Sequence, residues 1–265
     1  MRSLAKREIE RLDRLIDGLA HPAHVDATVH ATRKGIKRLR AFLRLARKSA
    51  GTTTYRVENA ALRDTGLLLG PARDGYVLID TARSLDADAA VIEELEERHR
   101  VALADLESGR RIETRRRLEA IAARWRIHVA ADPDASSIGA GLERTYRRAL
   151  VDYERVLATP TAAAFHGWRR RAKYIRYQLE ALEAPATLVR GYLELGDDLG
   201  LEHDHTVLLA VCTELVGRDG FAELAARADE RREALRMRAT ARGEELFIEE
   251  PGSYRRTVVR AVDIA

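Results

Sequence analysis

The stretch FHGWRRRAKYIRYQLEAL, residues 165–182, combines a helical repeat of apolar side chains with an unbalanced positive charge. Its large apolar residues recur every three or four positions, as in an α-helix with one buried face. Five cations lie between His166 and Arg176 with no acid among them. Like charges one helical turn apart repel each other, so stability alone does not favour this composition. The stretch therefore predicts a helix with one buried face, but by itself it does not show whether the charged face binds an anion or is only solvated.

A second stretch of the same kind lies in the N-terminal half of the chain. Residues 29–45, VHATRKGIKRLRAFLRL, align without gaps on residues 165–181. Downstream, LLGPARDGYVL (68–78) aligns on DLGLEHDHTVL (198–208). Two motifs that recur in the same order predict an internal duplication. The superposed basic residues are His30 with His166, Arg33 with Arg169, Lys34 with Arg170, Lys37 with Lys173, and Arg40 with Arg176.

The whole chain of 265 residues has the composition of an all-α protein, and no alternating strand-like run of convincing length occurs in it. The six prolines fall between periodic segments, where helices begin or end. We expect one domain over 1–265, with pseudo-symmetric halves at about 3–131 and 136–262, each a bundle of about four to five helices. The predicted helices are 3–20, 25–49, 53–69, 74–108 with a break near residue 86, 111–130, 136–158, 161–183, 186–199, 204–217, 220–247 and 253–262.

Several classes of protein are disfavoured by the sequence. The charged, amphipathic N-terminus does not resemble a signal peptide, and no stretch approaches the ~20 apolar residues of a membrane span. The single cysteine, Cys212, excludes a disulfide within one chain and is expected to be a buried small hydrophobe. The net charge is only +4, but residues 30–48 hold eight Lys or Arg and no acid. We therefore expect a soluble cytoplasmic protein with a concentrated basic surface and no membrane partner.

On a helical wheel, the cations of both stretches fall on one side and the apolar residues on the other. We define the first stripe as His30, Arg33, Lys37, Arg40 and Arg44, and the second stripe as His166, Arg169, Lys173 and Arg176. The predicted buried faces are Ile36, Leu39, Phe42 and Leu43 in the first helix and Trp168, Ala172, Ile175 and Leu179 in the second. Each stripe offers a cation at every turn of ~5.4 Å, a spacing that suits a long polyanion. The like charges nearby are also expected to lower the pKa of His30 and His166.

The downstream motifs GPARD and GLEHD are read as helix boundaries. In this interpretation the glycine ends one helix, and Asp74 or Asp204 caps the next. Arg73 and His203 then lie just before a helix N-terminus, where backbone N–H groups also attract anions.

These paired motifs resemble those of the CHAD family, the conserved histidine α-helical domain, over about residues 3–262. The resemblance implies two helical bundles whose basic helices line a central cleft or pore, and it implies binding of inorganic polyphosphate, with storage granules as a related location. Three departures from the family pattern are Gly35, Tyr174 and Gly75. With the neighbouring cations of the two stretches included, the expected polyphosphate-binding residues are His30, Arg33, Lys34, Lys37, Arg38, Arg40, Arg44, Arg73, Arg144, Arg147, Arg148, His166, Arg169, Arg170, Lys173, Arg176 and His203.

Two other functions remain open at this stage. A nucleic-acid binder would use the same basic stripes, although aromatic residues make up only 5% of the chain and Tyr177 is the one plausible stacking platform on them. A metal-dependent phosphohydrolase would use His203 and Asp204, but the matching element of the first half, PARD, offers no equivalent ligand set. We therefore expect a binding protein rather than an enzyme, with no catalytic residue, metal or cofactor.

Overall fold

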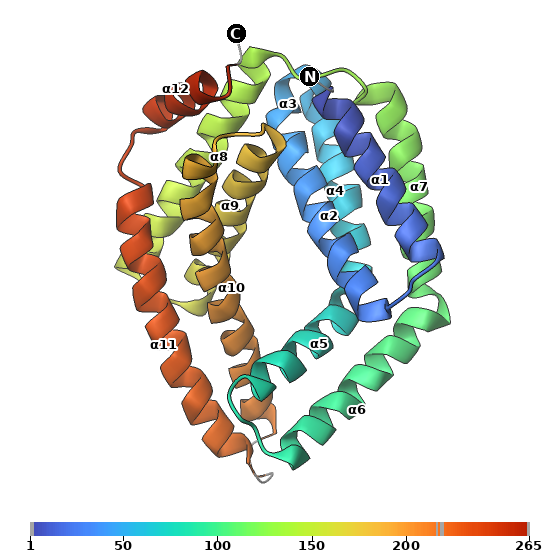
Figure 1. The fold of residues 1–265 in the computed structure, drawn as a ribbon, viewed down its shortest axis with the longest axis vertical. Helices are drawn as coiled ribbons and strands as arrows, with labels where there is room; N and C mark the ends of the chain where they lie inside the picture. Colours follow the sequence, from blue (N-terminus) through green and yellow to red (C-terminus); the bar gives the residue numbers. More distant parts are fainter. Residues whose placement is uncertain (1–2, 216, 218–219, 264–265) are drawn as a thin grey trace.

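The computed structural model describes residues 3–215, 217 and 220–263, and every regular element within these residues is a helix (Figure 1). This confirms the all-α fold class. The helices are α1 (Leu4–Ala20), α2 (Val25–Leu45), α3 (Arg47–Ala50), α4 (Thr52–Leu68), α5 (Gly70–Arg83), α6 (Ala89–Asp105), the π-helical turn η1 (Leu106–Arg110), α7 (Arg111–His128), α8 (Ala135–Ala158), α9 (Ala162–Ala181), α10 (Ala186–Glu214), α11 (Phe221–Leu246) and α12 (Pro251–Ala261).

Most predicted boundaries agree with these helices to within a few residues, but two predictions are wrong. The sequence predicted separate helices at 186–199 and 204–217, whereas α10 is continuous from Ala186 to Glu214. The end of the second of these predicted helices includes residue 216, which lies outside the described residues. The helix predicted at 74–108 begins earlier, at Gly70, whereas its predicted break near residue 86 is confirmed, because α5 ends at Arg83 and α6 begins at Ala89.

The helices form a closed ring in the view of Figure 1. On one side α1, α2, α4 and α7 pack against one another, and on the other side α8 to α12 pack together. The two sides meet where α2 packs against α9, and α5 bridges them because it contacts both α2 and α10. The pairing of α5 with α6 closes the lower end of the ring. The internal duplication itself stays a prediction.

The apolar faces predicted for both basic helices are buried in the main core. Phe42 of α2 packs on Trp125 of α7, with ring centroids 5.8 Å apart. On the other side, Trp168 of α9 lies 5.0 Å from Tyr153 of α8 by the same measure. A smaller core joins α5, α6, α10 and α11, and it includes Cys212, which is 2% exposed as predicted. None of the helices in the described part of the chain is long and apolar enough to cross a membrane.

Close helix contacts account for two of the glycines that depart from the family pattern. A Cβ at Gly35 would lie 2.6 Å from a methyl carbon of Leu15, so the glycine lets α1 approach α2. A Cβ at Gly75 would lie 2.8 Å from His99 Nδ1, which brings α5 against α6. Glycine lowers the helix propensity at these positions, and the closer packing of the helices compensates for this loss.

A glycine that lies against backbone atoms of another helix predicts a stability change. A Cβ at Gly141 of α8 would lie 2.6 Å from the carbonyl oxygen of Arg44 and 2.7 Å from Leu45 Cα, which are backbone atoms that cannot rotate away. Gly141→Ala should therefore lower the free energy of unfolding by roughly 1–3 kcal/mol through overpacking. The matched control is Gly18→Ala in α1, where no atom lies within 4 Å of the added Cβ. Thermal and urea unfolding should show the control to be neutral or slightly stabilised, and equal effects would contradict the packing argument.

Candidate anion-binding site

Cations from three helices converge where the two sides of the ring meet. We call five of them the central cations: Arg33 and Lys37 of α2, Arg73 of α5, and Arg169 and Lys173 of α9. All five side chains are half-buried. The charges of Arg169, Arg33 and Arg73 all act on Lys37, and the charge of Lys37 acts in turn on Lys173. The two stripes predicted from sequence therefore meet in one site.

The two lysines at the centre carry the strongest signs of this crowding. Burial and then the charge of Arg169 lower the pKa of Lys37 to about 8. Burial and the charges of Arg169 and Lys37 lower the pKa of Lys173 to about 7. A cation is disfavoured when it loses water and gains like-charged neighbours, and both effects act here in the same direction.

The glycines of the downstream motifs give these cations room. A Cβ at Gly70 would lie 3.5 Å from Arg33 Nη1, and a Cβ at Gly200 would lie 3.3 Å from Lys173 Nζ. Each glycine thus borders a central cation of the same half of the chain. The interpretation of these glycines as helix ends is wrong, because Gly70 begins α5 and Gly200 lies inside α10.

The aspartates of the same motifs are acids within the site and cap no helix. Asp74 lies inside α5 with Oδ1 3.8 Å from Arg33 Nη2, and Asp204 lies in the middle of α10. Burial raises the pKa of Asp204, against the opposing charges of Arg169 and Lys173. Because these helices begin at other residues, Arg73 and His203 also lie within helices, and the predicted helix N-terminal anion sites are absent there.

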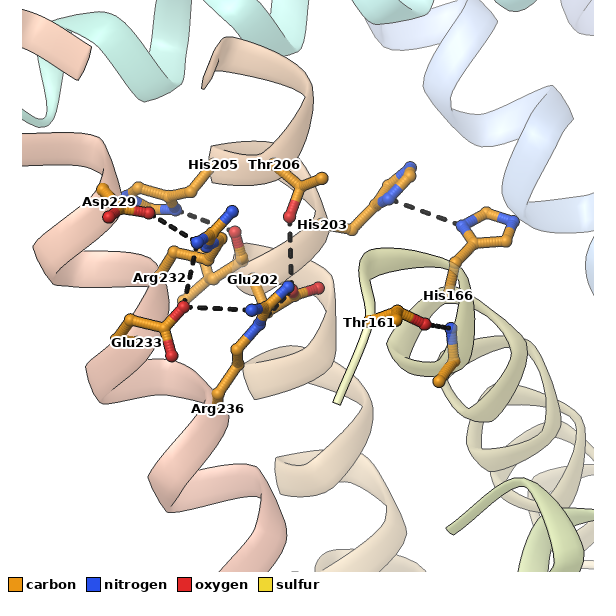
Figure 2. A network of polar contacts seen from close by, with 12 residues as sticks. Thr161, His166, Glu202, His203, His205, Thr206, Asp229, Arg232, Glu233 and Arg236 are labelled. Carbon is orange, nitrogen blue, oxygen red and sulfur yellow. Dashed lines mark hydrogen bonds and ion pairs between the residues drawn. The ribbon is translucent and has the colours of Figure 1, made fainter. Parts of the chain in front are cut away.

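Two histidines, one on α9 and one on α10, meet as Figure 2 shows, and the charge of the central cation Arg169 acts on both. His166 Nδ1 of α9 lies 3.4 Å from His203 Nδ1 of α10, so one ring donates to the other. Burial, followed by the charge of Arg169, lowers the pKa of His203 to about 3 and also lowers the pKa of His166. Partial burial, followed by the charge of Arg73, lowers the pKa of His30. The expected direction is confirmed for His30 and His166, with burial as its first cause.

The residues around His203 do not converge on a metal. His205 is buried on the side of α10 that faces α11, where its Nδ1 donates to the carbonyl oxygen of Leu201 at 2.8 Å. Among the described residues, no group of three or more His, Cys, Asp or Glu side chains could hold a metal ion. The positive charges of Arg169 and Lys173 beside His203 would also repel a metal cation.

The outer cations of the stripes have partners of their own. Glu180 accepts from Arg38 Nη2 at 2.5 Å and from Arg176 Nε at 2.7 Å. Tyr177, 6% exposed, lies between these two guanidinium groups, with its ring centroid 5.5 Å from Arg38 Cζ and 5.6 Å from Arg176 Cζ. It is therefore too buried to serve as a stacking platform for a base.

The other end of the first stripe extends toward α8 and α9. Arg40 Nε donates to Asn59 Oδ1 at 3.1 Å, and Arg44 Cζ lies 3.7 Å from the ring centroid of Tyr174. Tyr174 thus gives Arg44 a cation–π partner where the family pattern has a cation. Burial chiefly lowers the pKa of Arg44, and Arg171 is among the charges that lower it further. Sequence reasoning did not select Arg171, although it lies in the acid-free run of residues 165–179.

The remaining predicted residues lie at the edge of the site or outside it. Lys34 of α2 and Arg170 of α9 lie beside the stripes, and their charges act on His30 and His166 respectively. Arg144, Arg147 and Arg148 lie on α8, away from the central cations. Arg148 acts on both Arg144 and Arg171, so the basic surface continues from α9 onto α8.

The comparisons with known proteins agree with this fold. The CHAD domain family model matches residues 5–211, and the chain belongs to this family. The crystal structure of the CHAD domain from the plant Ricinus communis is similar, with a TM-score of 0.58 and 21% sequence identity over 99% of this chain and 90% of that chain. Among curated proteins, no sequence matches this chain significantly.

The lowered lysine pKa values predict how stability depends on pH. Lys173 has a pKa of about 7 in the folded protein and its ordinary value of 10.5 in the unfolded chain. At any pH between these two values, the folded protein therefore binds fewer protons at this residue than the unfolded chain does. The destabilisation from Lys173 is therefore fully present below pH 7 and is relieved as the pH rises toward 10.5. Lys37 acts likewise between about 8 and 10.5.

A Lys37→Met, Lys173→Met double variant should melt a few degrees higher than the parent chain at pH 6.5, because the cost of burying two charges and their repulsion by the neighbouring cations are both absent. The difference in Tm should shrink as the pH approaches 10. Scanning calorimetry from pH 6 to 10 measures it. A difference independent of pH would assign the gain to packing alone. A variant that melts lower at every pH would refute the repulsion.

Proposed function

We propose that this protein binds inorganic polyphosphate at the central cations, without changing it chemically. The observation that carries the proposal is the convergence of five half-buried cations from α2, α5 and α9. The carboxylates whose charges act on them are Asp74, Asp197, Asp204 and Glu202, and two of these also pair with arginines outside the five, Asp197 with Arg176 and Glu202 with Arg236. In the free protein these cations repel one another, and an anion with regularly repeated charge would reduce this repulsion. The similarity to the CHAD family supports the same ligand class.

A linear chain of phosphates fits the arrangement better than a single phosphate does. Each stripe presents a basic residue at every turn of its helix, and the stripes continue on both sides of Lys37 and Lys173. One polymer could therefore contact cations of both halves of the chain at once. Beyond the central cations, the basic residues that extend from Arg40 on α2 to Arg148 on α8 would contact further phosphates of the same polymer.

A nucleic acid is the second candidate, and the side chains favour it less. Binding of single strands usually requires exposed aromatic rings on which bases stack. Tyr174 and Tyr177, which lie on the second basic helix, are 7% and 6% exposed and are covered by arginines. Tyr76 of α5 is 41% exposed, and its ring centroid lies 5.3 Å from Arg73 Cζ, so a single exposed ring there would offer little stacking to a strand of bases. A polymer made only of phosphates needs no such platform.

The salt dependence and charge-reversal variants test the proposal together. If the five central cations each contact a phosphate, the affinity for long polyphosphate should fall with salt at a log–log slope of about −3.5, at roughly 0.7 per contact. Lys37→Glu and Lys173→Glu should each weaken binding by about 10- to 100-fold, because each removes a charge-assisted contact and adds repulsion. Calorimetric titration at several salt concentrations, with released phosphate measured in parallel, gives both results.

The controls are Arg115→Glu on α7 and Arg231→Glu on α11, two exposed arginines outside the stripes. They should change affinity less than threefold. Equal losses in the stripe and control variants would show a diffuse attraction instead of a site. Steady release of phosphate would refute binding without chemistry, and stronger binding of DNA or RNA would favour the second candidate.

Binding should also take up protons near neutral pH. Lys173, with its pKa of about 7, and the two histidines with lowered pKa values should gain protons when phosphates replace repulsive neighbours. Their pKa values rise on binding, so affinity should strengthen as the pH falls through the window between the free and bound values. Calorimetry at pH 7.5 in buffers of different ionisation enthalpy measures the uptake. Lys173→Arg keeps the charge but cannot release its proton, so it should lower the uptake, and an unchanged uptake would exclude Lys173 as its source.

A further inference from the structure

A second group of arginines lines a pocket between α8 and α12, apart from the central cations. The pocket has a volume of about 520 Å³, within the ~300–1,000 Å³ that is typical of small-ligand sites. Four arginines and one carboxylate line it: Arg144 and Arg147 with Glu143 on α8, and Arg255 and Arg256 on α12. At its edge, Lys48 Nζ of α3 donates to Oγ of the lining residue Ser136 at 2.5 Å.

The carboxylate does not neutralise this group. Glu143 is shared, because Arg147 donates to it and Arg255 Nη1 lies 3.3 Å from its Oε2. Arg144 and Arg256 form no ion pair with any described residue. Arg256 reaches only Ser253 Oγ, at 2.8 Å, and Arg144 Nη2 is buried without a hydrogen-bond partner among the described residues. A buried donor without a partner is costly, which is the state that an anion would relieve.

The packing of α12 holds its arginines over α8. A Cβ at Gly139 would lie 3.2 Å from Arg255 Cδ, so the glycine lets the stem of Arg255 lie against the first turns of α8. Tyr254, 4% exposed, anchors α12 by stacking on Tyr146 of α8 at a centroid distance of 4.2 Å. Residues 251–261 lie beyond the 5–211 matched by the family model, so the pocket joins a helix inside this match to one outside it.

We infer that this pocket is a second anion site, which binds a compact phosphate-bearing ligand through Arg144, Arg147, Arg255 and Arg256. The planar guanidinium group matches two phosphate oxygens at once, and the pocket offers four such groups from two helices. The terminal phosphates of a polyphosphate chain and a free small phosphate compound share this chemistry. The inference does not depend on polyphosphate binding at the central cations.

The test uses inorganic tripolyphosphate as the probe and the full chain carrying Lys37→Gln and Lys173→Gln, which weakens the central site. Calorimetry should show one saturable site in this variant. Adding Arg144→Gln and Arg256→Gln should weaken it at least tenfold. Ser136→Glu, an exposed change that adds a negative charge to the pocket without removing packing, should give a similar loss.

The matched control is Arg260→Gln, an exposed residue on α12 one turn beyond Arg256 that does not line the pocket. It should leave tripolyphosphate binding unchanged, and melting curves establish that each variant is folded. No binding in the Lys37→Gln, Lys173→Gln chain, or equal losses in the pocket and control variants, would overturn the inference.

A competition assay then identifies the source of the phosphate. The parent chain is first saturated with long polyphosphate and then titrated with tripolyphosphate. Loss of tripolyphosphate binding assigns the pocket to the polymer, and retained binding assigns it to a free phosphate compound. Because the pocket is tested in chains that lack Lys37 and Lys173, failure of the central proposal and failure of this inference give different results.

Discussion

Repulsion among cations at the meeting of α2 and α9 is the constraint to which the rest of the fold responds. Two unit charges ~6 Å apart repel by about 3 kcal/mol at an effective dielectric constant of ~20. Lys37 lies in the field of three such neighbours, Arg169, Arg33 and Arg73. The α2–α9 contact cannot derive its stability from these residues. Contacts elsewhere along the two helices, such as Arg38 with Glu180 and Arg44 with Tyr174, hold it together with the helices behind them.

Apolar packing and buried ion pairs supply that support on the outward faces. Behind α9, Phe247 packs its ring against those of Tyr153 and Trp168, with centroids 5.5 and 6.1 Å away. Behind α10, the buried carboxylate of Asp198 accepts from Arg238 at 2.9 Å and from Arg242 at 2.7 Å. This acid ties α10 to α11, whereas Arg169 and Lys173 of α9 form no ion pair within the part of the chain that the structure describes.

The helical class, the buried faces and the two stripes could be predicted from the sequence because they depend on local periodicity. The continuity of α10 could not. Glycine at position 200 usually signals a helix end, but here the missing side chain makes room for Lys173, a residue distant in sequence. The predicted helix caps at Asp74 and Asp204 were wrong for the same reason: they assumed that the glycines end helices, and the tertiary contacts of these glycines cannot be read from the sequence. The pocket between α8 and α12 was also hidden, since nothing in the sequence indicates that Arg255 lies beside Glu143.

The site gives a physical reason for lysine at positions 37 and 173 in a chain that otherwise uses mainly arginine. Lysines are five of the 46 basic residues, and two of them occupy the matched central positions 37 and 173. Arginine stays protonated at any pH that a protein meets, so an arginine here would carry the full repulsion in the free state. Lysine can release its proton, and the pKa values of about 8 and 7 place that release near neutral pH. Deprotonation of these lysines thereby reduces the repulsion in the free protein, and they bind protons again when an anion binds beside them.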